Sequence, residues 1–391
     1  MCIISLLSCT SQGSAAKPLE TPTPTSPALP TMTPTPIVIN QTPLTQTQAW
    51  GNGHVTHFPV TFGTRFFNAG GNYGENTITD DGQMCGTIES AIAFTDPAQL
   101  LQEVQSIALI DLHTGAMTTI QTMPAGYQGL TCAVTGSWVI WLQAYGATYE
   151  GFQTHWKIMA LNRQTQELRL LDESKLPNGQ TPPNVILPYP SASNGQVVWT
   201  TFADNQAHLE AVEYNLATQQ KTVLAQNASN PEISWPWVNW GDATKQGIVF
   251  ENLVTHQQIF LAQQPSGAAF DGTSFTFADS AYTNITLYPS ILPDHISTSY
   301  VVGQSINGDF VQFPYLNDRL VTWDSNQTLF AFDRKLQRLV KIDGIFGNPR
   351  PYISSHYFVW TQAISQADVD ASLKGAPLHL IMYVIDTNTL P

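Results

Sequence analysis

The sequence is poor in charged residues, and above all in positive ones. Charged residues make up 11% of the 391 residues, against about 25% in an average soluble protein. The 15 Lys+Arg stand against 29 Asp+Glu, which gives a formal net charge of −14. Nucleic-acid binders need a basic surface to meet phosphate, and polybasic patches dock proteins on anionic lipid. The composition therefore argues against both kinds of surface, and we expect no nucleic-acid partner.

Two further absences narrow the class of protein. No apolar run reaches the ~18 residues of a membrane-spanning helix, and four Cys are too few for a small scaffold held together by disulfides. Apolar residues, at 42%, and aromatic residues, at 10%, are instead abundant enough for a sizeable core. The 26 Pro and 26 Gly indicate many turns.

The chain opens with a short apolar segment that ends in a cysteine. Leu6-Leu7-Ser8-Cys9 resembles the lipobox of bacterial lipoproteins, where the Cys is lipidated and becomes the new N-terminus. No Lys or Arg precedes the apolar stretch, which is shorter than a usual signal, so a chance Ser-Cys pair is the alternative. We predict a signal segment over residues 1–9, lipidation at Cys9, and an extracytoplasmic protein anchored to a bacterial cell membrane.

Residues 10–49 are of low complexity and rich in Thr and Pro. Thr21-Pro22-Thr23-Pro24-Thr25 is continued by a second such run at 31–36. Proline removes amide donors and favours extended polyproline II, so this composition predicts a disordered or semi-rigid stalk. The folded domain is then expected over residues 50–391.

From residue 50 on, two phrases recur. The first is a Pro with a large aromatic, a turn, and an apolar strand that ends in an aromatic. Its copies are Pro188-Tyr189 with Val197–Trp199, Pro236-Trp237 with Ile248–Phe250, Pro314-Tyr315 with Leu320–Trp323, and Pro351-Tyr352 with Tyr357–Trp360; Leu130 with Trp138–Trp141 lacks the Pro. The second phrase is an alternating strand, a polar turn and another strand. It enters its turns at Asp111, Asn162, Asn215, Asp333 and Asp386.

The spacing of these turns predicts the architecture. Successive turn-entry residues are separated by 51, 53, 118 and 53 positions, so one copy is expected inside the long interval, with Gln257–Leu261 as its strand. Two phrases give four strands per repeat, and four-stranded repeats near fifty residues without helical segments are typical of β-propeller blades. We predict an all-β fold with a single β-propeller of six four-stranded blades, five or seven being possible.

The order of the two phrases resembles the six- and seven-bladed propellers of the TolB type. The resemblance covers most of residues 60–391 and implies an extracytoplasmic repeat protein.

The sequence contains few signs of catalysis. There is no Gly-x-Ser-x-Gly elbow, phosphate-binding loop or dinucleotide fingerprint. His54-x-x-His57 lacks a third ligand nearby, so we predict no metal and no cofactor. Some propeller glycosidases use carboxylates that face the axis. The candidates for such a group are Asp81, Asp242, Glu251, Asp318 and Asp324.

Aromatic residues that do not recur between blades are the better ligand candidates. One Gly-containing segment, between the second and third strands of the second predicted blade, is rich in them. Its candidate ligand-binding residues are Tyr145, Tyr149, Phe152, His155 and Trp156. Such side chains suit stacking on sugar rings or on a partner's peptide, and the alternative is a lid folded over the blade. The segment 362–378 is expected on the same face.

Two structural pairings are also expected. Cys85 and Cys132 occupy similar places in what we assign as the first strands of neighbouring blades, so they either form a disulfide or remain buried thiols. The last blade, which enters its third strand at Leu380–Ile385, lacks a fourth. We predict that part of residues 54–67 supplies it, the alternative being a strand beyond Pro391.

These expectations favour a monomeric, non-enzymatic binding or scaffold protein. Its partners would be the membrane, through the lipid anchor, and an envelope protein or a cell-envelope polysaccharide. The alternative is a propeller-type carbohydrate-active enzyme, a hydrolase or a lyase, on the same anchor.

Overall fold

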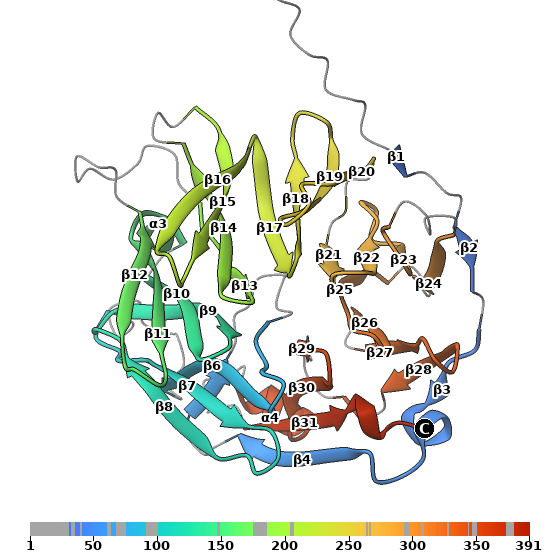
Figure 1. Ribbon diagram of the computed structural model, residues 1–391. Helices are drawn as coiled ribbons and strands as arrows, with labels where there is room; N and C mark the ends of the chain where they lie inside the picture. Colours follow the sequence, from blue (N-terminus) through green and yellow to red (C-terminus); the bar gives the residue numbers. More distant parts are fainter. Residues whose placement is uncertain are drawn as a thin grey trace, which may run out of the picture.

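Short antiparallel sheets are arranged in a ring around a central axis (Figure 1). The computed structural model describes residues 31–32, 36–39, 41–60, 64–67, 76–90, 101–146, 149–174, 186–203, 207–262, 265, 267–292, 298–305, 309–326, 328–342, 344–345, 350–372 and 379–391. The described residues form seven sheets, each with four antiparallel strands. Within that described part, no helix is long and apolar enough to cross a membrane.

The first three blades follow the chain, each from the axis outward. They are β5 (Thr64–Phe67), β6 (Gln83–Ser90), β7 (Ser106–Asp111) and β8 (Met117–Thr122); β9 (Tyr127–Thr135), β10 (Trp138–Tyr145), β11 (Trp156–Asn162) and β12 (Leu168–Glu173); and β13 (Ser191–Ser193), β14 (Gln196–Phe202), β15 (Leu209–Asn215) and β16 (Gln220–Gln226). A short helix, α3 (Tyr149–Thr154), lies between β10 and β11.

Four further blades complete the ring. They are β17 (Ala228–Ser234), β18 (Trp237–Asp242), β19 (Gly247–Asn252) and β20 (Gln258–Leu261); β21 (Gly267–Phe270), β22 (Phe275–Ala278), β23 (Asn284–Tyr288) and β24 (Tyr300–Gln304); β25 (Val311–Leu316), β26 (Leu320–Ser325), β27 (Thr328–Asp333) and β28 (Arg338–Ile342); and β29 (Arg350–Ile353), β30 (Tyr357–Ala363) and β31 (Leu380–Asp386), joined by β4 (Val55–Val60). The helix α4 (Gln366–Ser372) follows β30, and the single turn η2 (Thr387–Thr389) follows β31.

The prediction of a single β-propeller with four-stranded blades is confirmed, and the number of blades is seven, which the prediction allowed beside its first choice of six. The additional blade lies in the interval from Asn215 to Asp333. There the Pro236-Trp237 pair enters the second strand of blade 4 rather than its first, and Phe250 lies on the third strand, β19. The hidden turn is at Asn252, whose side chain accepts the N–H groups of Val254 and Thr255. The segment Gln257–Leu261, which the sequence predicts as a third strand, contains the fourth strand, β20. A further blade, β21–β24, therefore fits before β25.

Seven apolar clusters hold the ring together, one between each pair of neighbouring blades. The buried tryptophans Trp141, Trp199, Trp240, Trp323 and Trp360 share one position on the second strands of their blades and pack toward the preceding blade. The recurring aromatic position of the sequence is therefore inter-blade packing, since a buried aromatic side chain removes roughly 150–250 Å² from water.

The ring is closed by a strand from the other end of the chain. β4 pairs antiparallel with β31, with Phe58 opposite Met382 and Val60 opposite Leu380. The predicted pairing of residues 54–67 with Leu380–Ile385 is thus confirmed, in blade 7 rather than blade 6. The cluster between blades 7 and 1, which contains Met382 and Met84, shows that the closure buries apolar surface.

The segment before β4 runs along the outer rim, and we call its described part the belt (residues 31–32, 36–39 and 41–50). Its two-residue strands β1 (Thr31–Met32), β2 (Ile37–Val38) and β3 (Leu44–Thr45) pair in parallel with β20, β24 and β28 of three successive blades (Figure 1). The sequence assigned this part to the stalk because its prolines cannot build a sheet interior. An edge strand of two residues needs few donors, so Thr/Pro segments can still add to a rim.

The belt ends in a helix that is firmly attached to blade 6. In α1 (Gln46–Trp50), Thr45 caps the first turn through a reciprocal pair of hydrogen bonds with Gln48. The Trp50 side chain is buried, and its indole N–H donates to Asp333 at 2.9 Å. Asp333 also pairs with Arg319 at 2.8 Å. The folded part of the chain therefore begins before residue 50.

Candidate functional site

One face of the ring contains the connections from second to third strands and from blade to blade, and we call it the loop face. The connection from β10 to β11 and that from β30 to β31 are both of this kind. Because neighbouring strands are antiparallel, the described parts of both connections lie on the loop face, as the sequence predicted for 145–156 and 362–378. Ligand-contacting residues on propellers are most readily supplied by such loops.

At blade 2 the loop face has a small aromatic cluster. Tyr145, at the end of β10, is 37% exposed. Its ring centroid lies 5.5 Å from that of Tyr127 and 6.3 Å from that of His155. The Lys157 ammonium lies 5.9 Å from the Tyr127 ring centroid. The structure therefore brings together two of the five predicted residues, Tyr145 and His155, with a partner that the sequence analysis missed.

Of the other three predicted residues, only Trp156 has a side chain that the structure describes. Trp156 is 5% exposed and packs in the core between blades 2 and 3, so it does not present a surface to a ligand. Tyr149 and Phe152 lie on α3, and their side chains are outside the described residues. Cys9 lies outside them as well.

The five candidate carboxylates do not form one group around the axis. Asp81 belongs to blade 1. Asp242, at the end of β18, and Glu251, on β19, belong to blade 4, and Asp318 and Asp324 belong to blade 6. Glu251 accepts a hydrogen bond from Gln258 at 2.7 Å. Within the described ranges, no three His, Cys, Asp or Glu side chains lie close enough together to hold a metal ion.

A polar cavity opens on the loop face between blades 4 and 5. Its volume is 220 Å³. Polar and charged lining residues are Ser229, Asn230, Glu232, Asn239, Asp242 and Gln246. Gly241, Gly247, Gly267 and Ala268 contribute little side-chain bulk to the walls. The volume is below the ~300–1,000 Å³ of drug-sized sites, so the cavity suits one sugar residue or one side chain.

Glu232 is the most unusual group in this cavity. It lies on β17, the inner strand of blade 4, and is 5% exposed. One carboxyl oxygen receives a long hydrogen bond of 3.5 Å from the Asn239 amide, and the other has no hydrogen-bond partner among the described residues. Burial raises the pKa of Glu232 to about 8, and the Asn239 hydrogen bond opposes this only in part. A buried acceptor left unpaired is costly, which makes it a marker of a site that a ligand completes.

The second carboxylate of the cavity is in a different state. Asp242 ends β18 and accepts the backbone N–H groups of Thr244 and Lys245 at 2.9 and 2.8 Å. The Lys245 ammonium lies 3.4 Å from its other oxygen. Asp242 is thus satisfied by its own turn, whereas Glu232 is not.

The repeat explains why a cavity exists at this place. Pro231-Glu232-Ile233-Ser234 in blade 4 corresponds to Pro351-Tyr352-Ile353-Ser354 in blade 7, because both stretches pair with the second strand in the same register. In blade 7, the ring of Tyr352 fills the gap to the next blade. A shorter carboxylate at that position leaves the gap to blade 5 open. The sequence pattern does not single out Glu232, because Pro236-Trp237 matches the recurring Pro-aromatic pair and Pro231-Glu232 does not.

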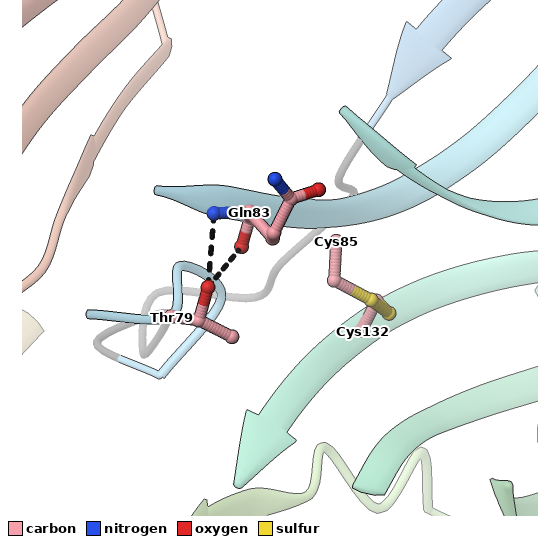
Figure 2. Close-up of a disulfide and its surroundings, with 4 residues drawn as sticks. All are labelled: Thr79, Gln83, Cys85 and Cys132. Carbon is pink, nitrogen blue, oxygen red and sulfur yellow. Dashed lines mark hydrogen bonds between the residues drawn. A yellow bond between two sulfur atoms is a disulfide. The ribbon is translucent and has the colours of Figure 1, made fainter. Parts of the chain in front are cut away.

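The two cysteines join blades 1 and 2. Cys85 and Cys132 form a disulfide with a Cα–Cα distance of 5.8 Å (Figure 2). Cys85 lies on the second strand of its blade, β6, and Cys132 on the first strand of the next, β9. The prediction that both cysteines lie on first strands is therefore wrong. The offset between a second and a first strand brings them within bonding reach.

The same region contains a bridge on the side opposite to the loop face. Thr79 exchanges two hydrogen bonds with Gln83 at the start of β6 (Figure 2). Just before it, the Asn76 carbonyl accepts the N–H of Val134 in blade 2 at 2.6 Å. The Asn76 side-chain amide donates to the Ile233 carbonyl in blade 4 at 3.1 Å. The segment therefore connects the inner strands of blades 2 and 4 and braces the strand that holds Glu232.

Comparisons with known proteins show the fold and no closer relationship. No protein-family model matches the chain, and no curated protein matches its sequence. An oligogalacturonate lyase from Vibrio parahaemolyticus is similar over 86% of this chain and 95% of that one, with 10% identity and a TM-score of 0.52. TolB from Acinetobacter baumannii is similar over 78% and 65%, with 10% identity and a TM-score of 0.40.

A third similar structure is the β-propeller domain of the trilobed protease from Pyrococcus furiosus. It matches 84% of this chain and 97% of that one, with 9% identity and a TM-score of 0.48. Together with the seven sheets around one axis, the likeness to the lyase defines the chain as a β-propeller protein. Fold alone does not determine what a propeller binds or catalyses, so function has to be argued from the cavity and its surroundings.

Proposed function

We propose that this chain is a non-enzymatic, extracytoplasmic binding protein that recognises a cell-envelope polysaccharide or protein on its loop face. The observation behind the proposal is the cavity between blades 4 and 5, where the buried Glu232 leaves one oxygen unpaired. The exposed Tyr145 with Tyr127 and His155 supplies a second contact surface on the same face. Polar pockets and exposed aromatic side chains are both typical of sugar and peptide recognition.

The proposal includes the lipid anchor at Cys9 and the TolB-type character of the repeat. Labelling bacterial cells with a palmitate analogue, in the wild type and in Cys9→Ala, tests the anchor. Unchanged labelling in the variant would overturn it without affecting the proposed binding function.

The test of the binding function copies blade 7 onto blade 4. The double variant Glu232→Tyr with Asn239→Val places in blade 4 the residues that pack between blades 7 and 1. Binding of envelope polysaccharide fragments, measured by isothermal titration calorimetry, is expected for the wild type and lost in the double variant. Glu213→Gln is the matched control, because Glu213 is also a carboxyl whose pKa burial raises, but it does not line the cavity. Equal binding by all three proteins would contradict the proposal.

A carbohydrate-active enzyme is the second candidate, and the pKa of Glu232 favours it. A carboxyl with a pKa near 8 is protonated at neutral pH, which is the state of a general acid. Asp242 is a second carboxylate in the same cavity, and glycosidases need such a pair. Release of reducing ends from polysaccharide by the wild type and not by Glu232→Gln would support the enzyme, and binding without turnover would support the first proposal.

A further inference from the structure

The cavity between blades 4 and 5 offers hydrogen-bond acceptors without a matching cation. Two of its lining side chains are carboxyl groups, and none of the lining residues is Lys, Arg or His. Lys245, in the adjacent hairpin, is bound to Asp242. The unpaired oxygen of Glu232 therefore has no positive group to meet it among the described residues.

We propose that this cavity binds an amino sugar and that the ligand's ammonium group lies against Glu232. The inference rests on the proposed binding function and names the class of its ligand. A primary ammonium is compact and has three donors, so it can supply the missing partner of Glu232 with a charge-assisted hydrogen bond.

The rest of the lining argues for a sugar rather than for the side chain of a protein. Ser229, Asn230, Asn239 and Gln246 place hydroxyl and amide groups around the carboxyl. Such groups can donate to and accept from the hydroxyls of a sugar ring. A lysine side chain would instead bring a four-carbon apolar stem, which leaves these polar groups unpaired. The volume of 220 Å³ also matches a single ring rather than a longer ligand.

Binding of this kind is coupled to a proton. At neutral pH the free protein holds Glu232 in the carboxylic acid form, since burial raises its pKa to about 8. When the ammonium enters, Glu232 becomes a carboxylate paired with it, and the proton passes to the buffer. No bond of the sugar breaks, and the ligand keeps its own proton.

Other titratable groups do not replace Glu232 in this role. The neighbouring strands β13, β14 and β21 have no titratable side chain. β18 contributes Asp242, and the hairpin that follows it contributes Lys245, which pairs with Asp242. β15 contributes Glu210, Glu213 and Tyr214, none of which lines the cavity. Glu251 on β19 and Lys221 on β16 do not line it either.

The experiment is calorimetric titration of the full chain at pH 7 with glucosamine, glucose, N-acetylglucosamine and lysine amide, in two buffers of different ionisation enthalpy. Glucosamine is expected to bind roughly tenfold or more tighter than the two neutral sugars, the range of a charge-assisted hydrogen bond. It is also expected to release close to one proton, which the buffer dependence of the heat reports.

The variant Glu232→Gln separates the possible outcomes. It is expected to bind glucosamine no better than glucose and to release no proton, while Glu213→Gln behaves as the wild type. Equal affinity for glucosamine and glucose would overturn the ammonium site but leave the proposed binding function standing. Lysine amide that binds tighter than glucosamine would overturn the sugar assignment. If none of the four probes binds, the inference is overturned. The titration with polysaccharide fragments tests the proposed function separately.

Discussion

The first two strands of blades 4 and 7 follow the same plan, but one buried pair between them is polar in blade 4 and apolar in blade 7. Both have an inner strand in the pattern Pro-x-Ile-Ser and a second strand with a buried tryptophan, Trp240 in one and Trp360 in the other. The pair between these strands is Tyr352 opposite Val359 in blade 7 and Glu232 opposite Asn239 in blade 4. Blade 7 therefore closes against its neighbour with apolar contacts, while blade 4 leaves a polar cavity.

This difference shows how to separate structure from function in a repeat protein. Every blade must pack against the next, so residues that the blades share are explained by this packing and not by ligand binding. A blade that gives up an apolar contact for a buried carboxyl loses stability, since burial of an unpaired charged or polar group costs several kcal/mol or shifts its pKa. Glu232 and Asn239 thus replace, with polar groups, the apolar pair that blade 7 has at the same place.

The largest expected effect concerns how the two blades are completed. Blade 7 takes its outer strand from β4, whereas blade 4 is built from consecutive strands. Deleting residues 1–60 should lower the melting temperature by roughly 10 °C or more, because it exposes β31 and opens the cluster between blades 7 and 1. Scanning calorimetry measures this, and an unchanged melting temperature would show that β4 does not close the ring.

The next effect is expected to be equal in both blades. Trp240→Ala and Trp360→Ala should each reduce the free energy of unfolding by about 3–5 kcal/mol, because each leaves a large cavity between blades. Urea denaturation followed by circular dichroism tests the pair. A much smaller loss at Trp240 would indicate that blade 4 is loosely packed throughout, and not only at Glu232.

A pH-dependent difference should isolate Glu232. Its pKa is about 8 in the folded protein against an ordinary value of 4.5, so the folded state keeps a proton that the unfolded state releases. The stabilisation that this group gives is present below pH 4.5 and is lost by ~1.4 kcal/mol per pH unit as the pH rises toward 8. Glu232→Gln does not titrate, so it should gain on the wild type over this range. A constant difference between the two proteins from pH 5 to 8 would refute the raised pKa.

The smallest effect is expected where the belt touches blade 4. Deleting residues 1–35 removes β1, which pairs with β20 over two residues only. The free energy of unfolding should change by less than about 1 kcal/mol, the range of one or two net hydrogen bonds. A loss comparable to that of the 1–60 deletion would place the stabilising element in the belt instead of β4.

Much of the fold was predictable from local patterns, but the number of blades was not. The closing strand could be predicted because His54–Phe62 has β-forming residues and the last blade lacked a partner. The count failed because an Asp or Asn that accepts backbone N–H groups marks any tight turn. Asp111 does so between the third and fourth strands of blade 1. Asp271 does so between the first and second strands of blade 5, and Asp242 between the second and third strands of blade 4.

The candidate site was harder to predict, for a different reason. The aromatic segment stood out in the sequence by its composition, and the structure confirms only that Tyr145 and His155 lie together on the loop face. Glu232 has an unremarkable local sequence, and its character comes from its burial between two blades. That property depends on Ala268 and Gly267 of the next blade, which no single-strand pattern reveals.

The belt also sets the order in which the molecule yields to a pull from its N-terminal side. Such a load first reaches β1 on blade 4, then β2 on blade 5 and β3 on blade 6, each a pair of only two residues. These three strand pairs can separate one after another before the load reaches the capped helix at Trp50 and its hydrogen bond to Asp333. Each pair that separates frees part of the belt from the rim while β4 still closes the ring. We therefore expect a pull on the N-terminal side to extend the rim before it disturbs the propeller or its cavity.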